Sequence, residues 1–566
     1  MLTTLAAPAF AGTWYIEDGD ITVKAGETEG KNTVSQGNKK DVEDTNTIIT
    51  NQNKDKASSN TVTIDAGNDK VEVTLDNVNI KADSGSALTS KGDVTLTLKG
   101  DNSFTGGISG NSSYDLSGIS SSGSLTISGG ETDSLTAQGG SGENGGDGIF
   151  SFGRVAISGG TVNANGGDGK NGSDGGDGIC SDSGDVTISG GTVTATGGGS
   201  TGSNGLGGRG ICSDSGGVTI SGGTVKATGG NGDYSGGDGI SSSDRVAISG
   251  STVTANGGDS SSRNGASGIS SSGGVTISGG STVTANGGNG GNVSGDGIRS
   301  DGGVTISGGT VKAAGGDSKD GYGGDGIRSG GGVTISGNTV NAAGGNGGKV
   351  GGYGICSFDR VAISGGTVEA AGGSSGSSNG GSGIYSNDID LSGSLELTAK
   401  AGSPNGKALS QKGSELDLNA IKDKLGPGAK VTATDADGKV IDQVPIPRPV
   451  EPEESSSSSD GGSAAPSAPA FSLPGLTVTD KDGQRISYTS TQSGNTLTVC
   501  VGRLTASFRI SLAALRQLRA EGIEAITFQT ILCSTTLSVD ELLAMGGKDA
   551  EVVLTHRFTD SSLTVG

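Results

Sequence analysis

The chain has 566 residues, of which 114 are glycine and only 3% are aromatic, so a conventional globular core built from large side chains is excluded. Its 60 acidic and 38 basic residues give a formal charge of −22, which argues against nucleic acid or an anionic lipid surface as a partner. After the N-terminus, no run reaches the roughly 18 apolar residues that a membrane-spanning segment needs.

The N-terminus has the pattern of a secretory signal. Small and apolar residues lead to Ala9, Phe10 and Ala11, an A-x-A cleavage pattern, although no basic segment precedes them. We therefore expect residues 1–11 to be a signal-peptide remnant and the protein to be secreted or displayed on the cell surface. Residues 12–85 are more charged and contain alternating runs such as NTVTIDAG, which predict the N-terminal cap and first coils of a repeat structure.

Residues 86–400 consist of a repeat of about 29 residues. A Gly-Ile pair recurs with the isoleucine at positions 119, 149, 179, 211, 240, 269, 298, 327, 355 and 384, in steps of 28 to 32 residues. After Ile298, the apolar residues Val304 and Ile306, and then Val311 and Ala313, alternate with polar residues, as in short strands. Glycine and serine pairs between them predict turns.

Three short strands per repeat, with no helix between them, predict an all-β fold: a right-handed parallel β-helix. Stacked coils would bury ladders of like residues in a narrow core. Leu88, Val94 and Leu96 should extend these ladders before the regular repeats, and Leu409 after them. About 12 coils at a strand spacing of about 4.8 Å would form a rod on the order of 55 Å long. The spacing of leucine-rich repeats and the Trp-Asp pair of propellers are absent.

Coil length varies mainly between the third strand of one coil and the next isoleucine. The gaps from Ala164, Ala195, Ala227 and Ala255 to that isoleucine are 15, 16, 13 and 14 residues. One side of the rod should therefore carry all the loops, and binding groups are most often found on loops.

The repeats are followed by a different kind of sequence. We expect a C-terminal cap over residues 401–442 and an extended linker over residues 443–474, which contains seven of the ten prolines together with the acidic and serine-rich run EPEESSSSSD. Residues 475–566 combine strand patterns with SLAALRQLRAEG, a helix that Ser511 can cap, and predict a small α+β domain of unknown role. Cys500 and Cys533 could form a disulfide there if the protein is exported.

The segments DNVNIKADSGSALTSKGDVTLTLKGDNSFTGG and GISSSGSLTISGG, with the GI…VTISGGTVTATGG units that follow, resemble a known family. The family is that of the secreted carbohydrate-binding-domain-containing repeat proteins of Gram-positive gut bacteria, with a pectate-lyase-like parallel β-helix. The resemblance covers roughly residues 14–400. It implies sugar binding but identifies no binding residue, because GDGICSD or GDGIRSD stands here where the family often has GAGIGGG.

Aspartates recur two positions before the aligned isoleucine, at Asp147, Asp177, Asp238, Asp296 and Asp325. Neighbouring coils would hold two such carboxylates about 5 Å apart, close to the separation in a retaining glycosidase. We expect these residues to lie in hydrated turns, however, where nothing raises a carboxyl pKa as general acid catalysis requires. A structural role is therefore favoured over weak calcium sites at Asp147, Asp177, Asp296 and Asp325. Arg209 occupies the same position and suggests charge balance.

Aromatic side chains are the usual platforms for sugars, and five are weak candidates here, each of which could equally be a packing residue: Trp14, Tyr234, Tyr322, Tyr353 and Tyr385. Cys180, Cys212 and Cys356 share one repeat position, so the first two should stack on adjacent coils, either as a ladder of thiols, which we favour, or as a disulfide.

The sequence thus predicts a non-enzymatic, secreted or cell-surface β-helix that acts as an adhesin or carbohydrate-binding scaffold. Its expected partners are glycans or cell-surface polysaccharide, with no cofactor beyond possible calcium. Two alternatives stay open: a polysaccharide lyase or glycoside hydrolase on a β-helix, and a calcium-stabilised structural spacer. The single histidine, His556, lies in the tail domain, so it cannot complete a Ser-His-Asp triad on the rod.

Overall fold

The structure is a computed structural model and describes residues 12–28, 30–108, 116–444, 476–480, 485–486, 488–493, 495–501, 505–530, 534–545, 551–557 and 560–565. The predicted signal-peptide remnant and nearly all of the predicted linker lie outside these residues. The chain divides into two compact units, Met1–Glu451 and Pro452–Gly566.

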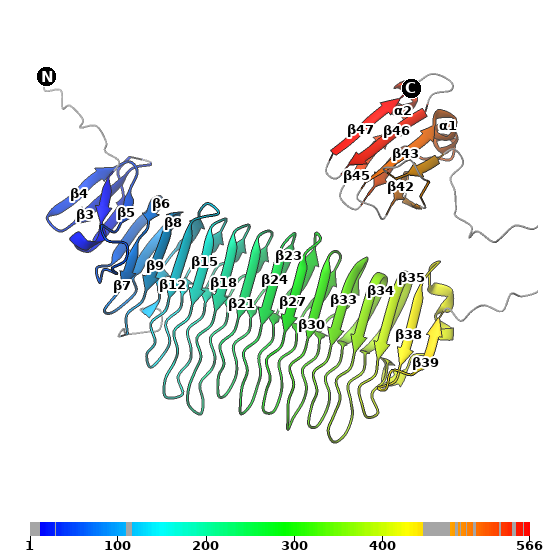
Figure 1. Ribbon diagram of the computed structural model, residues 1–566, viewed down its shortest axis with the longest axis horizontal. Coiled ribbons are helices and arrows are strands. Elements are labelled where there is room, and N and C mark those ends of the chain that lie inside the picture. The colour runs from blue at the N-terminus through cyan, green and yellow to red at the C-terminus, as the bar shows by residue number, and fades with distance from the viewer. Residues whose placement is uncertain are drawn as a thin grey trace, which may run out of the picture. The chain divides into compact units, whose positions relative to one another are not determined.

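The first unit is a parallel β-helix of about 15 turns, somewhat more than the predicted 12 because the N-terminal segments add coils of their own. Each regular coil contributes three strands, and every strand pairs in parallel with its counterpart in the next coil (Figure 1). The first strands are β10 (Ile119–Ser121), β13 (Ile149–Ser151), β16 (Ile179–Ser181), β19 (Ile211–Ser213), β22 (Ile240–Ser242), β25 (Ile269–Ser271), β28 (Ile298–Ser300) and β31 (Ile327–Ser329).

The second and third strands of the coils follow in the same order. The second strands are β11 (Ser124–Ser128), β14 (Val155–Ile157), β17 (Val186–Ile188), β20 (Val218–Ile220), β23 (Arg245–Ser249), β26 (Gly274–Ser278), β29 (Gly303–Ile306) and β32 (Val333–Ile335). The third strands are β12 (Ser134–Gln138), β15 (Thr161–Asn165), β18 (Thr192–Thr196), β21 (Thr224–Thr228), β24 (Thr252–Asn256), β27 (Thr282–Asn286), β30 (Thr310–Ala314) and β33 (Asn338–Ala343). In the last two full coils the three strands merge into β34 (Ile355–Ala371) and β35 (Ile384–Lys400).

The register places identical residues above one another, as the repeat predicts. Ile298 pairs with Ile327, Val304 with Val333, and Ala313 with Ala342, and all of them are buried. The predicted extensions of the ladders are confirmed, because Ile119 pairs with Leu88 and Ile384 pairs with Leu409. The β-helix core is therefore a stack of Ile, Val and Ala ladders, to which each coil adds one rung.

Antiparallel strands occur at both ends of this unit, where a parallel stack would expose unpaired edges. The N-terminal strands are β1 (Thr13–Tyr15), β2 (Ile21–Ala25), β3 (Asn32–Gln36), β4 (Lys39–Asp44), β5 (Ile48–Thr50), β6 (Val62–Asp76), β7 (Asn79–Lys81), β8 (Leu88–Lys99) and β9 (Asp101–Thr105). The C-terminal strands are β36 (Leu409–Gln411), β37 (Ser414–Glu415), β38 (Lys430–Thr434) and β39 (Val440–Val444). The antiparallel pairs are β2–β3, β3–β4, β36–β37 and β38–β39.

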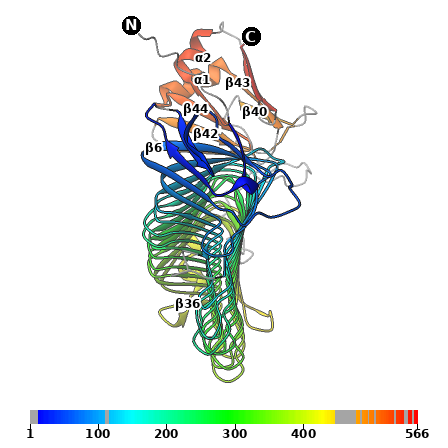
Figure 2. The same cartoon turned by 90° about the vertical axis from the view of Figure 1, so that its left-hand side faces the viewer.

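The loops between the third strand of one coil and the first strand of the next all lie on one side and stack on each other (Figure 2). We call these segments the loop layer. In it Gly208 N donates to Gly198 O of its own loop at 2.8 Å, and Gly230 N of the next loop donates to Gly208 O at 2.7 Å. A Cβ atom on Gly208 would lie 1.9 Å from Gly176 O. The glycines of this layer thus serve close backbone approach, whereas the sequence predicted only a turn-forming role for glycine.

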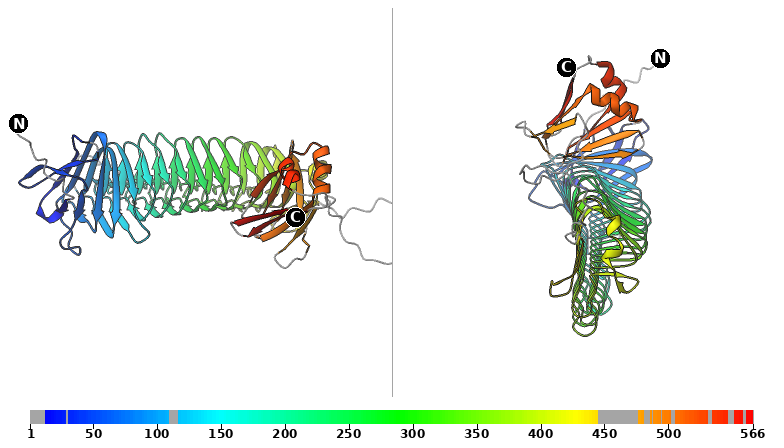
Figure 3. Two further views of the ribbon diagram at one scale, coloured as in Figure 1. Left: turned by 90° about the horizontal axis from the view of Figure 1, so that it is seen from above. Right: turned by 90° about the vertical axis from the view of Figure 1, so that its right-hand side faces the viewer.

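The second unit contains two four-stranded sheets, seen with its two helices in Figure 3. One sheet has the order β40 (Leu476–Thr479), β43 (Thr505–Ser511), β46 (Glu551–Arg557), β47 (Asp560–Val565), and the other β41 (Thr489–Ser493), β42 (Thr496–Cys500), β44 (Ala525–Gln529), β45 (Ser534–Ser538). Helix α1 (Leu512–Ala520) begins as predicted, with Ser511 accepting the Ala514 N–H, and α2 spans Val539–Met545. Among the described residues, neither helix has the length or apolar character needed to cross a membrane.

Candidate functional site

The aspartates two positions before the aligned isoleucines connect successive coils through hydrogen bonds to the backbone. We call this repeat position the acidic column. Asp147 Oδ1 accepts the N–H of Asp177 at 2.6 Å, and Asp296 Oδ1 accepts that of Asp325 at 2.7 Å. In the same way Asp325 Oδ1 accepts the N–H of Tyr353 at 2.7 Å. One oxygen of each carboxyl group thus satisfies a backbone amide of the next coil, which supports the structural role that the sequence favoured.

The expectation that these aspartates lie in hydrated turns was wrong for Asp147, Asp296 and Asp325, whereas Asp177 and Asp238 are half-buried. Only 5% of Asp147, 8% of Asp296 and 4% of Asp325 is exposed to solvent. The reason is the loop layer: the glycine-rich segments on either side of the column pack against neighbouring backbone instead of forming open turns.

Burial changes the acid–base properties of the column. It raises the pKa of Asp325 to about 7, with a further increase from the neighbouring Asp296. Burial also raises the pKa of Asp147, Asp238 and Asp296. The argument from environment against catalysis therefore no longer holds for Asp325, because a carboxyl group that titrates near neutral pH can transfer protons.

A groove of about 1140 Å³ runs along the stack, from the coil of Asp177 to the coil of Tyr353. Three rows of residues line it; the first two recur from coil to coil, whereas the third contributes Ser270, Arg299 and Arg328. The first row is the acidic column; the second comes from the loop layer, where residues of successive loops form parallel bridges; the third follows the aligned isoleucines. The loop row consists of Leu206, Ser235, Asn264, Val293, Tyr322 and Val350.

Three arginines place positive charge in the groove. Arg209 forms ion pairs with Asp177, at 2.9 Å, and with Asp214, so the charge balance expected for it is present. Arg328 pairs with Asp325 at 3.1 Å and lies over the ring of Phe358. Arg299, which stands next to Arg328 in register, is exposed. The sequence interpretation missed Arg299 and Arg328, although both follow an aligned isoleucine and could have been found by comparing that position across the repeats.

Of the five aromatic candidates, Tyr322 and Tyr353 line the groove. The ring of Tyr385 stacks on that of Tyr353 with centroids 4.9 Å apart. Tyr234 is exposed beside Arg263 and is not among the residues that line the groove. The structure thus brings Tyr322, Tyr353 and Tyr385 to one end of the groove.

Trp14 cannot serve as a sugar platform. Its side chain is buried, and Nε1 donates to Asp44 Oδ2 at 2.7 Å inside the N-terminal cap. Trp14 is therefore a packing residue of the N-terminal cap, which is the alternative that the sequence left open.

The four candidate calcium ligands are not gathered into a cation-binding cluster. Asp177 and Asp325 are paired with Arg209 and Arg328, and Asp147 and Asp296 accept backbone N–H groups. Within the described ranges, the one group of three or more side chains arranged to hold a metal is Asp177, Cys180 and Cys212.

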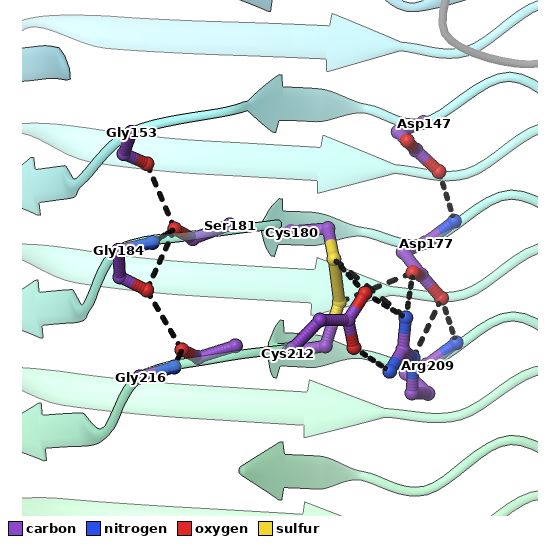
Figure 4. Close-up of a disulfide and its surroundings, with 11 residues drawn as sticks. Asp147, Gly153, Asp177, Cys180, Ser181, Gly184, Arg209, Cys212 and Gly216 are labelled. Atoms are coloured by element: carbon purple, nitrogen blue, oxygen red, sulfur yellow. Dashed lines mark hydrogen bonds and ion pairs between the residues drawn. A yellow bond between two sulfur atoms is a disulfide. The ribbon is translucent and has the colours of Figure 1, made fainter. Parts of the chain in front are cut away.

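Cys180 and Cys212 form a disulfide between adjacent coils, so the favoured ladder of thiols was wrong (Figure 4). Their positions are paired directly in the register, and their Cα atoms lie 4.7 Å apart, which is within the range that a disulfide spans. Cys356, at the same position further along, has no cysteine in register and is a buried thiol. The predicted bridge between Cys500 and Cys533 involves Cys533, which lies outside the described residues.

Four segments of the chain match a family model described as a β-helix repeat: residues 155–177, 186–208, 218–244 and 304–327. The chain matches no curated protein and no solved structure. The matched segments all lie in the regular coils that carry the acidic column and the groove. Over these four segments the chain is thus similar to β-helix repeat proteins, in agreement with the parallel β-helix of the first unit.

Proposed function

We propose that this protein is a non-enzymatic, secreted or cell-surface scaffold that binds an extended glycan chain along the groove. The observation that carries the proposal is the shape and lining of the groove. It is long and open along the stack, and polar groups recur in it once per coil beside the exposed Tyr322 and the stacked pair Tyr353 and Tyr385. A polymer with a regular repeat is the ligand class that such a row of like groups suits.

A glycan array probed with the full chain tests this function. Tyr353→Ala should weaken binding about tenfold, because one aromatic contact contributes up to ~1.5 kcal/mol. Tyr234→Ala is the matched control: it removes an exposed tyrosine of the loop layer that does not line the groove, and it should leave affinity unchanged. Equal effects of the two variants, or no binding to any glycan, would reject the proposal.

A second candidate is a polysaccharide hydrolase or lyase. It is favoured by one observation: Asp296 and Asp325 are buried neighbours in the groove, and the pKa of Asp325 is raised to about 7. Release of new chain ends from a bound polysaccharide, abolished by Asp325→Asn, would establish this activity. The substitution keeps a side-chain oxygen that can accept the Tyr353 N–H, so loss of folding is not the expected result.

A further inference from the structure

The disulfide between Cys180 and Cys212 lies against two carboxylates. Cys212 Sγ is 3.1 Å from Asp177 Oδ2, and Cys180 Sγ is 3.8 Å from Asp214 Oδ2. The candidate ligand atoms of Asp177, Cys180 and Cys212 all lie within 4.8 Å of one another. Figure 4 shows the disulfide beside Asp177 and Arg209, and Arg209 Nη2 lies 3.7 Å from Cys180 Sγ.

The backbone holds the two cysteines together whether or not the sulfur atoms are bonded. Hydrogen bonds between the two coils flank the pair, from Ile179 N to Gly210 O at 2.9 Å and from Asp214 N to Ser181 O at 2.8 Å. Reduction would therefore leave two thiols facing each other across adjacent strands, with Cα atoms held about as close as the present 4.7 Å.

Two thiolates and two carboxylates form a tetrahedral donor set for a soft divalent cation such as Zn²⁺ or Cd²⁺. Zinc–sulfur bonds of about 2.3 Å place two sulfur atoms on one ion roughly 3.8 Å apart, which two cysteines paired on adjacent strands can reach. We propose that reduction of the disulfide by a dithiol converts this position into a metal site with Cys180, Cys212, Asp177 and Asp214 as ligands.

The chemical step balances. The dithiol supplies two electrons and two protons to the S–S bond and becomes a cyclic disulfide, and two cysteine thiols result. The cation then displaces both thiol protons and forms two metal–sulfur bonds. With Asp177, Asp214 and Arg209 ionised, the cluster carries a single net negative charge both in the oxidised form and in the reduced, metal-bound form. A cavity of about 230 Å³ lined by Asp177, Cys180, Arg209 and Asp214 gives the ion access and Arg209 space to move.

Cadmium titration of the full chain tests this site, in a background where Cys356, Cys500 and Cys533 are replaced by serine. After reduction and removal of the dithiol, one equivalent of Cd²⁺ per chain should produce ultraviolet cadmium–thiolate absorption. The oxidised protein should produce none. Absence of the absorption in the reduced protein, or its presence in the oxidised one, overturns the proposal.

The carboxylates are tested separately, in variants that keep both cysteines. Asp177→Asn and Asp214→Asn should each weaken Cd²⁺ binding by at least about 10–100-fold. Loss of a residue that only orients a metal ligand already costs that much affinity. Asp182→Asn, a half-buried aspartate at the equivalent position of the preceding coil, is the matched control and should leave affinity unchanged. Far-ultraviolet circular dichroism should match the parent throughout. Binding that is insensitive to both Asp177 and Asp214 would mean an adventitious thiol site and would overturn the proposal.

Discussion

Asp177 binds Arg209 twice, once through the backbone and once through the side chain. Asp177 Oδ1 accepts the Arg209 N–H at 2.5 Å, and Asp177 Oδ2 lies 2.9 Å from Arg209 Nη2. The two residues occupy the same repeat position in successive coils. Their contacts therefore both join the coils and neutralise charge in the groove. Burial alone would lower the pKa of Arg209, but Asp177 and Asp214 raise it, so Arg209 stays charged.

Replacing Arg209 should therefore destabilise the β-helix. Arg209→Gln leaves Asp177, whose side chain is only 15% exposed, without its cation, and we expect a loss of about 1–3 kcal/mol in the free energy of unfolding. Arg360→Gln is the control, because Arg360 also pairs with two aspartates but its side chain is 51% exposed, and exposed ion pairs contribute about 0–1 kcal/mol. Chemical denaturation measures both. Equal losses for the two variants would contradict the role assigned to Arg209.

Asp325 should make stability depend on pH. Its pKa is raised from 3.8 to about 7, mainly by burial and further by Asp296. Between about pH 4 and pH 7 the folded protein therefore keeps a proton on Asp325, whereas the unfolded chain has lost it. The contribution of Asp325 to stability is thus fully present below about pH 4 and is lost as pH rises toward 7. The decline is at most about 1.4 kcal/mol per pH unit for one proton.

Asp325→Asn should remove this decline, because an amide stays neutral, so the variant should become more stable than the parent protein as pH rises from 4 to 7. Asp317→Asn is the matched control: Asp317 is exposed and also accepts a backbone N–H of the next coil, from Asn346 at 2.6 Å. Melting curves across this pH range measure the difference. A constant difference between Asp325→Asn and the parent protein would show that Asp325 does not titrate as described.

The glycines of the loop layer should be irreplaceable where the backbones approach. Gly208→Ala would place a Cβ atom 1.9 Å from Gly176 O, so we expect a loss of about 1–3 kcal/mol or more from overpacking. Gly199→Ala is the control, because its Cβ would meet no atom closer than 3.5 Å. Both substitutions lower the conformational entropy of the unfolded chain equally. Similar melting temperatures for the two variants would contradict the tight packing of the layer.

Calcium should not be needed for stability. The candidate ligands Asp177 and Asp325 are already neutralised by arginines, and Asp147 and Asp296 are bound to backbone amides. A chelator should leave the melting temperature unchanged. A decrease that added calcium reverses would instead support the calcium-stabilised spacer.

The coil architecture could be predicted because it depends on local periodicity. Val304, Ile306, Val311 and Ala313 alternate with polar residues within one coil, and their burial follows directly from that pattern once the copies stack. The small tail domain and the cap on α1 were predicted for the same reason: Ser511 and the apolar face of the helix are adjacent in sequence.

The properties of the groove could not be predicted in the same way. The burial of Asp325 and the close contact at Gly208 depend on how loops from successive coils pack, which no single repeat encodes. The disulfide required the direct register of Cys180 against Cys212, whereas only their shared repeat position could be recognised from the sequence. The chemistry of the column thus arises from stacking.

The dependence of affinity on ligand length tests the glycan-binding groove most directly. The groove crosses six coil spacings, from Asp177 to Tyr353, and at about 4.8 Å per coil it is roughly 29 Å long. For the glycan selected on the array, affinity should increase with each added sugar until the oligosaccharide reaches that length, and Tyr353→Ala should weaken the long oligosaccharides most. Affinity that is independent of length, or unchanged in Tyr353→Ala, would contradict binding along the groove.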